Sequence, residues 1–301
     1  MRQPGLVPAD GPLRRAGHSG GQRRPPTTVG RTQRPRFRLT GSATYERPAA
    51  AGRSGIKGHV NDTLNLWKAG LAEAPDAIWQ HTGLRVLILA DNALTRLPPA
   101  LGRLLRLHTL DLGHNRLAGI PEEIGELSGL TRCLYLHDNR LPRLPRSLGR
   151  LDRLGYLNVG ENPLGGLPEE LGGMAGLVEL RAQHAELTAL PGSIGQLSAL
   201  RELWLRGNRI TALPAGVSAL RALRQLELRE NALSEVPEPL RGLPRLRHLD
   251  LRGNRIRTLP DWVAELPALE KLDLRWNPLD EGVDDGPVVR ALGERGCVVL
   301  G

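Results

Sequence analysis

The chain contains little lysine and few cysteines or aromatic residues, and it has no long apolar run. Only Lys57, Lys68 and Lys271 are lysines among its 41 basic residues. The two cysteines, Cys133 and Cys297, lie far apart in the sequence and form no disulfide framework, which favours a reducing compartment. No stretch of about 18 apolar residues is present, so no transmembrane helix is predicted. We therefore expect a cytoplasmic protein.

The excess of basic residues is concentrated at the N-terminus. Residues 1–60 contain eleven arginines and one lysine but only two acidic residues, a net charge of +10, and the remaining 241 residues sum to −1. A segment this rich in Arg, Pro and Gly has few apolar side chains to bury, so it cannot offset the entropy lost on ordering. The sequence predicts a disordered basic tail over residues 1–60 and a folded region over residues 61–301.

Three interpretations of residues 1–60 stay open. The segment is a solvated tail without a specific role, or a basic arm that makes weak contact with nucleic acid or an anionic surface. The third interpretation is that it is not translated. Val60 immediately precedes the first residue in repeat register, and a GTG codon there could serve as a bacterial start.

A 23-residue repeat organises the rest of the chain. The stretch from Leu200 to Ala222 reads LRELWLRGNRITALPAGVSALRA, and its pattern begins again at Leu223 and at Leu246. Leucine stands at the first, fourth and sixth places and asparagine at the ninth, followed by a Leu-Pro step. A period of this length with this pattern is a signature of a stacked solenoid.

The repeats cover residues 61–279. A degenerate copy over 61–83 is expected at the N-terminal end, because a terminal repeat lacks a neighbour on one side. Regular copies occupy 84–279, and we assign 280–301 to a C-terminal cap. In the cap we expect a helix over Val288–Leu292 with Asp285 as its N-cap, then a last strand over Cys297–Leu300.

Each repeated position has a physical reason. The run x-x-L-x-L-x-x alternates as a strand with one buried face does, so its leucines point inward and its x residues outward. The asparagine is expected to satisfy backbone groups of its own and the adjacent repeat. The proline fixes φ and removes a donor, which predicts short helical or 3₁₀ turns on the opposite side.

Two repeats depart from this pattern. The copy at Leu130 has one additional residue, which predicts a bulge at the entry to its strand. The copy at Leu177 has Ala185 in place of the asparagine, so we expect its backbone groups to turn to water or to Gln183 and His184. This repeat is therefore predicted to be the weakest joint, which an Ala185→Asn substitution would stabilise.

The repeat resembles the 23-residue leucine-rich repeats of the Ras-group proteins and of many bacterial cytoplasmic proteins. The resemblance covers residues 61–301. It implies an α/β horseshoe-shaped solenoid with a concave parallel β-sheet and convex short helices or 3₁₀ turns. It also implies a non-enzymatic scaffold that binds another protein, and we expect a cytoplasmic adaptor or regulatory subunit in signalling.

Partner binding is expected on the outward-facing strand positions. Neighbouring strands lie about 4.8 Å apart, so equivalent positions of successive repeats form columns. Tyrosine, tryptophan and arginine are enriched at interface hot spots, and this sequence places them in these columns. The candidate partner-binding residues are Tyr135, His137, Tyr156, Arg181, Trp204, Arg206, Glu227, Arg229, Asp250, Arg252, Asp273 and Arg275.

The arginine column has two interpretations. In one, Arg206 to Arg275 pair with Glu227, Asp250 and Asp273 as a solvated, self-neutralising face. In the other, these arginines stack with Trp204 and form a binding patch. The indole is expected on the concave face because Leu203 and Leu205 on either side of it fill the core.

Catalytic and metal sites are not predicted. His108, His114, His137, His184 and Cys133 fall on different repeats and columns, without the close spacing of a zinc site. No Gly-x-x-x-x-Gly-Lys loop is present for phosphate, and no cofactor is expected. Two further functions stay open: a secreted bacterial effector that acts on host proteins, and a nucleic-acid-associated protein tethered by its basic tail.

Overall fold

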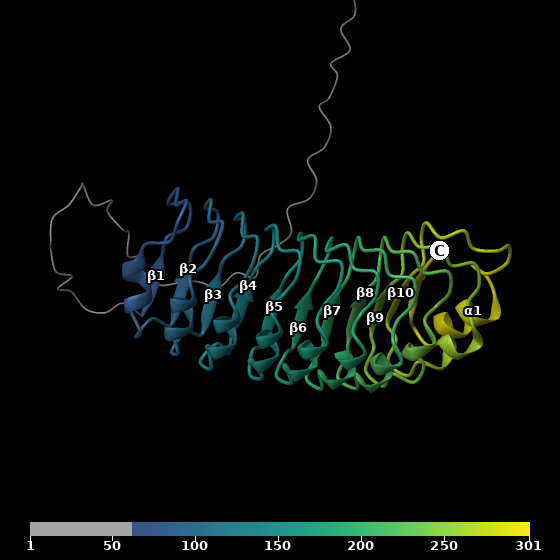
Figure 1. Ribbon diagram of the computed structural model, residues 1–301. Helices are drawn as coiled ribbons and strands as arrows, with labels where there is room; N and C mark the ends of the chain where they lie inside the picture. Colours follow the sequence, from purple (N-terminus) through teal and green to yellow (C-terminus); the bar gives the residue numbers. More distant parts are fainter. Residues whose placement is uncertain (1–61) are drawn as a thin grey trace, which may run out of the picture. The chain divides into compact units, whose positions relative to one another are not determined.

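The computed structural model describes residues 62–301, so the predictions for residues 1–60 and for Asn61 lie outside it. In the described part, eleven strands form one parallel sheet in which every strand pairs with its neighbours in sequence. Short 3₁₀ turns alternate with the strands and line the opposite side of the stack (Figure 1). The predicted leucine-rich repeat solenoid, with a sheet on one side and turns on the other, is confirmed.

The elements are short and regular. The strands are β1 Thr63–Asn65, β2 Val86–Ile88, β3 Thr109–Asp111, β4 Cys133–Tyr135, β5 Tyr156–Asn158, β6 Glu179–Arg181, β7 Glu202–Trp204, β8 Gln225–Glu227, β9 His248–Asp250, β10 Lys271–Asp273 and β11 Val298–Leu300. The helical elements are η1 Asp76–Gln80, η2 Pro99–Arg103, η3 Glu122–Glu126, η4 Arg146–Arg150, η5 Glu169–Gly173, η6 Gly192–Gln196, η7 Ala215–Ala219, η8 Glu238–Leu240, η9 Asp261–Glu265 and α1 Pro287–Glu294.

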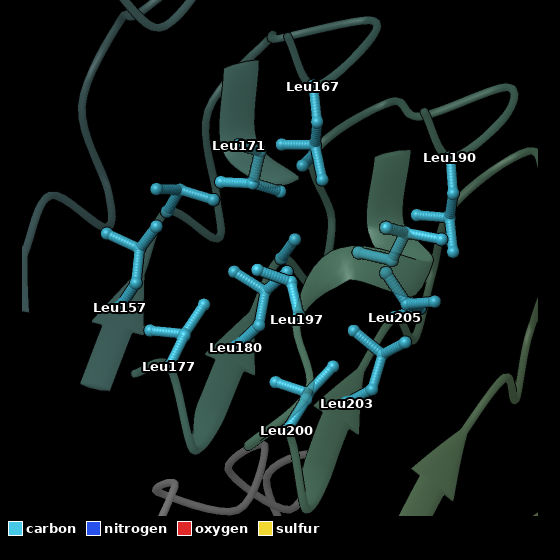
Figure 2. Close-up of a cluster of buried hydrophobic side chains, with 14 of the residues drawn as sticks. Leu157, Leu167, Leu171, Leu177, Leu180, Leu190, Leu197, Leu200, Leu203 and Leu205 are labelled. Atoms are coloured by element: carbon cyan, nitrogen blue, oxygen red, sulfur yellow. The ribbon is translucent and has the colours of Figure 1, made fainter. Parts of the chain in front are cut away.

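The repeated leucines form a continuous core between the sheet and the turns. Leu157, Leu180 and Leu203 stand at the centres of three successive strands and are at most 1% exposed. They pack against leucines of the turns such as Leu171 and Leu197, as Figure 2 shows. Burying one such side chain contributes about 1.5–3 kcal/mol. Because each repeat buries its leucines only against its neighbours, the stack is stable as an array rather than as separate units.

Where a repeat has the ladder asparagine, this side chain bonds the repeat to the one before it. Asn115 donates through Nδ2 to the carbonyl oxygens of Leu89 and Leu112, both at 3.0 Å. Its Oδ1 accepts the backbone N–H of Leu94 at 3.1 Å. Since Asn139 repeats this arrangement, the predicted role of the asparagines is confirmed.

The repeat without the asparagine satisfies its backbone by a different route. A ladder asparagine at position 185 would serve the N–H of Leu164, but this N–H donates instead to the carbonyl oxygen of Asn162 at 2.8 Å. Ala185 itself is completely buried. The expectation that the backbone groups of this repeat form hydrogen bonds with water, Gln183 or His184 is wrong.

The next asparagine makes an additional hydrogen bond at this repeat. The Oδ1 of Asn208 accepts both the Ala185 N–H and the Leu187 N–H, each at 3.0 Å. At the other ladder positions given above, Oδ1 accepts one N–H. The Ala185 repeat and the repeat that follows it are therefore held together by the Asn208 amide, which makes one additional hydrogen bond.

The additional residue of the Leu130 repeat is absorbed just before β4, as predicted. Elsewhere one carbonyl accepts two successive N–H groups; the Val178 oxygen, for example, accepts those of Arg201 and Glu202. Before β4 the chain presents two carbonyls instead, those of Thr131 and Arg132, and each accepts one N–H of the following repeat. The strand register is unchanged from β3 to β5.

Prolines and glutamates organise the turns. Each 3₁₀ turn begins directly after a proline, and from η2 onward this proline is extended, as Pro168 is before η5. The Glu169 carboxylate accepts the N–H groups of Gly192 at 3.0 Å and Ser193 at 2.9 Å in the next repeat, which holds the pKa of Glu169 below its usual value. The carboxylate thus joins successive turns where no strand ladder exists.

The C-terminal cap agrees with the prediction in its elements but not in its N-cap. Helix α1 begins at Pro287 and is followed by β11, which pairs with β10. Gly286 stands at the N-cap and makes no side-chain hydrogen bond, so the assignment of Asp285 is wrong. None of the helices between residues 62 and 301 has the length and apolarity needed to cross a bilayer.

Candidate functional site

The candidate site lies on the sheet face, by which we mean the outward-facing side chains of β1–β10 and of the residues directly after each strand. Register pairing places equivalent residues of successive strands side by side: Arg181 opposite Trp204, Trp204 opposite Glu227, and Glu227 opposite Asp250. Asp250 in turn stands opposite Asp273. The columns predicted from the repeat are therefore present.

Aromatic side chains gather over β4–β7. The rings of Tyr135 and Tyr156 lie 5.0 Å apart between centroids, and the Tyr135 and His137 rings 6.1 Å apart. The guanidinium of Arg181 lies 4.8 Å from the Trp204 ring centre and 6.0 Å from that of Tyr156. We call Tyr135, His137, Tyr156, Arg181 and Trp204 the aromatic row. Burial raises the pKa of both tyrosines, so their hydroxyls stay protonated at neutral pH.

Two contacts hold Trp204 in place, and a third fixes the arginine that stacks on it. Arg181 stacks on its ring and also pairs with Glu179 at 2.5 Å. The indole Nε1 donates to Glu202 at 3.3 Å. The side chain is half-buried as a result. Trp204 is thus a fixed, partly exposed apolar surface on the sheet face.

Most of the arginine column pairs with carboxylates of the chain itself. Arg206 donates to Glu230 at 3.1 Å, and Arg229 forms an ion pair with Glu227 at 3.1 Å. Arg275 makes two hydrogen bonds to Asp273, at 2.9 and 2.6 Å. These ion pairs agree with the interpretation in which the arginine column pairs with carboxylates of the chain, rather than with the one in which its arginines stack on Trp204.

Arg252 differs from the other three arginines. Its guanidinium lies 5.0 Å from the ring centre of Trp276 and makes no ion pair within residues 62–301. Trp276 is 73% exposed and has a φ of +62°. Nothing in the packing of the solenoid requires an indole there. Trp276 is therefore a candidate contact that the columns did not include.

A sequence signal for Trp276 does exist. It stands directly before the ladder asparagine, where other repeats have a polar residue or glycine, and this place has positive φ along the chain. Bulky residues avoid positive φ, so a tryptophan there is unusual and worth attention.

The three carboxylates in the column have different electrostatic surroundings. Burial and the neighbouring Asp273 raise the pKa of Asp250 to about 6. Burial also raises the pKa of Glu227, against the opposing effect of Arg229. For Asp273, burial is outweighed by hydrogen bonds from Arg275, which hold its pKa below the usual value. Of these three carboxylates, Asp250 is the one that forms no ion pair within residues 62–301.

Two histidines meet at the edge of the aromatic row. The Nε2 atoms of His114 and His137 are 3.2 Å apart, although the residues lie in different repeats and columns. Asp138 bonds the Nδ1 of His114 at 2.6 Å. The other three residues weighed as ligands, His108, His184 and Cys133, do not join this pair: within residues 62–301, no group of three or more His, Cys, Asp or Glu side chains is placed to hold a metal ion.

Comparison with known proteins identifies the repeat. The leucine-rich repeat family model matches residues 82–141, 198–256 and 237–279. No curated protein sequence matches the chain significantly.

Solved structures with the same fold come from plants and bacteria. The leucine-rich repeat ectodomain of the Arabidopsis thaliana receptor kinase GASSHO1/SCHENGEN3, in complex with CASPARIAN STRIP INTEGRITY FACTOR 2, is 31% identical with a TM-score of 0.61 over 72% of this chain. The plant peptide hormone receptor RGFR1 in complex with RGF2 is 31% identical with a TM-score of 0.55 over 68%. The functional domain of InlJ from Listeria monocytogenes is 26% identical with a TM-score of 0.62 over 73%.

This chain spans 27%, 38% and 45% of the lengths of those three structures. The similarity therefore concerns the repeats and not the whole of each protein. The family model, the eleven-stranded parallel sheet and the asparagine ladder agree. The chain is a leucine-rich repeat protein.

Proposed function

We propose that the chain is a non-enzymatic scaffold that binds another protein across its sheet face, with the aromatic row as the centre of the contact. The observation that carries the proposal is the packing of Tyr135, Tyr156 and Trp204 with Arg181 into one continuous patch. Aromatic and arginine side chains of this kind dominate the energy of protein interfaces. Their apolar faces contribute on burial, while their polar ends bond at the rim.

The row is already ordered before any partner arrives. Arg181 is held by Glu179, and the Trp204 indole by both Arg181 and Glu202. A partner therefore meets side chains that have little rotamer freedom left to lose, and this lowers the entropy cost of association.

The arginine column contributes to orientation more than to affinity. Since Arg206, Arg229 and Arg275 are already paired with carboxylates, a partner gains little by approaching them. Arg252 and Trp276 are the exception, because the guanidinium forms no ion pair with any of residues 62–301 and the ring is exposed. We propose that they form the outer end of the binding surface, together with Asp250.

In finer terms we propose a cytoplasmic adaptor or regulatory subunit in signalling. Both cysteines of the chain are free thiols, as expected in a reducing compartment. Two of the similar structures are complexes, with CASPARIAN STRIP INTEGRITY FACTOR 2 and with RGF2, so leucine-rich repeat chains with this similarity do bind other molecules. We extend polypeptide binding to this chain by analogy with those complexes.

The test is capture of a partner by the full-length protein, followed by measurement of the affinity for that partner. Trp204→Ala is expected to weaken binding by at least about 2 kcal/mol, since central aromatic residues carry most of the energy. Its melting temperature should stay close to that of the wild type, because the ring is half-exposed.

A matched control is available on another surface. Leu105 is 53% exposed in the loop between η2 and β3, so Leu105→Ala removes a large exposed apolar side chain away from the sheet face. This variant should bind as the wild type does. Equal binding by Trp204→Ala and wild type would refute the proposal, and a lowered melting temperature with normal binding would assign Trp204 to the fold.

A further inference from the structure

The rings of His114 and His137 are in close contact, and the backbone beneath them is shaped to allow it. Their Nε2 atoms are 3.2 Å apart, with ring centroids at 4.6 Å and ring planes at 80°. Gly113 makes room for the contact: it is buried, and a Cβ there would collide with the His137 ring. The His137 ring can therefore occupy this position only because residue 113 has no side chain.

Asp138 fixes the state of the His114 ring. Its carboxylate lies 2.6 Å from Nδ1, which places the Nδ1 proton in that hydrogen bond. The Nε2 of the neutral ring then carries the lone pair, on the side facing His137. A carboxylate that holds the far nitrogen of a histidine is also the arrangement that orients imidazole ligands of metal ions.

The distance between the two nitrogens suits one metal ion. Imidazole nitrogens bind zinc at about 2.0–2.1 Å, so two of them on one ion lie about 3.0–3.4 Å apart for angles between a right angle and the tetrahedral angle. The observed 3.2 Å lies inside that interval. In the metal-free protein the Nε2–H of His137 donates to the Nε2 of His114. Binding of an ion therefore requires this proton to move to the Nδ1 of His137 and both lone pairs to turn toward a common point.

We propose that His114 and His137 chelate a late first-row divalent ion, Zn²⁺ or Cu²⁺, with Asp138 positioning His114. Imidazole nitrogen suits these ions, whereas Mg²⁺ and Ca²⁺ require oxygen ligands. The His114 side chain is about one-third exposed, so water completes the coordination sphere on the open side. His137 also belongs to the aromatic row, with its ring 6.1 Å from that of Tyr135, so the site adjoins the proposed binding surface. Metal binding is measured without any partner.

The experiment titrates the full-length protein with ZnCl₂ and separately with CuCl₂, and follows the ¹⁵N-labelled imidazoles by NMR. The imidazole signals of His114 and His137 are expected to move together on binding of one Zn²⁺ ion. His114→Gln and His137→Gln should each lower the affinity at least about tenfold, and the double variant should lose little more than either. Asp138→Asn should lower it about 10–100-fold, the effect known for such carboxylates.

His184→Gln is the matched control. His184 occupies the same place in its repeat as His114, also with positive φ, and it lies over Gly207. Its loss should leave Zn²⁺ binding at the pair unchanged.

Three results would overturn the proposal. The two imidazole signals do not move with Zn²⁺; only one of them moves, as for an ion on a single histidine; or binding persists in both single variants. If a variant fails to fold, the NMR titration of the wild type still decides.

Discussion

Replacing Asn208 with alanine is expected to destabilise the solenoid more than the same replacement at a regular ladder position. The Asn208 amide donates to the carbonyl oxygens of Ala182 and Leu205 at 2.8 and 2.7 Å. Its Oδ1 accepts two N–H groups, from Ala185 and Leu187. Alanine would leave both donors buried without an acceptor.

Asn254 provides the comparison. It is as buried as Asn208, with 7% exposure at both, and its Nδ2 also donates to two carbonyl oxygens, those of Leu228 and Leu251. Its Oδ1, however, accepts only the N–H of Leu233. The two substitutions therefore remove the same atoms and differ in one stranded N–H.

The magnitude follows from that difference. A buried donor left without a partner costs about 1–3 kcal/mol, so Asn208→Ala should lose about 1–3 kcal/mol more than Asn254→Ala. For a domain of this size, 1 kcal/mol corresponds to about 2–4 °C in melting temperature. Calorimetry of both variants against the wild type measures the difference.

Hydrogen exchange separates this explanation from a general loosening of the stack. In Asn208→Ala, the amides of Ala185 and Leu187 should lose protection before those of distant repeats, because opening of a repeat array is local. Equal melting temperatures for the two variants would refute the reasoning. So would unchanged protection at both amides.

The same joint shows how far the sequence determines the structure. Leucine, asparagine and proline positions were predictable because every repeat offers them the same neighbours, and a repeated environment selects a repeated residue. At Ala185 the sequence correctly marks a missing amide. It does not predict which hydrogen-bond partners the backbone groups take. These depend on the backbone conformation near Leu164 and on the ability of the Asn208 oxygen to accept a second N–H.

The side-chain pairing on the sheet face was less predictable. Arg252 and Arg275 both follow an aspartate by two residues, yet Arg275 bonds that aspartate while Arg252 stacks on Trp276. A cation–π contact at the surface contributes only about 0.5–1 kcal/mol, so small local differences decide which partner an arginine takes. The columns predicted from the sequence show which side chains each arginine can reach, but not which of them it contacts.

The contact between His114 and His137 was not predicted from the columns, for a geometrical reason. His114 and His137 occupy adjacent places in adjacent repeats, so a comparison of equivalent positions separates them. Two features bring them together: the glycine at position 113, and the positive φ of the residue before each ladder asparagine. A sequence comparison that also pairs each position with the adjacent position of the next repeat would have predicted this contact.

Three further predictions concern single side chains. Ala185→Asn should be neutral or destabilising in urea unfolding, because Leu164 already has a hydrogen-bond acceptor; a gain above about 0.5 kcal/mol would contradict this. Trp276→Ala should shift stability by less than about 0.5 kcal/mol, as at most surface sites, yet weaken partner capture; a lower melting temperature would instead assign its stacking to the fold. The last concerns Asp250, whose pKa is raised to about 6 by burial and by Asp273. Between about pH 4 and pH 6 the folded protein keeps a proton on this carboxyl that the unfolded chain has released, so stability falls as the pH rises through this window. Asp250→Asn removes that loss and keeps an oxygen acceptor, so it should melt above the wild type at pH 8 and equally at pH 4. Asp273→Asn should do the reverse at pH 8, because bonded Asp273 has a lowered pKa and stabilises the fold in its charged form. A difference between Asp250→Asn and wild type that is the same at both pH values would show that packing, and not charge, is responsible.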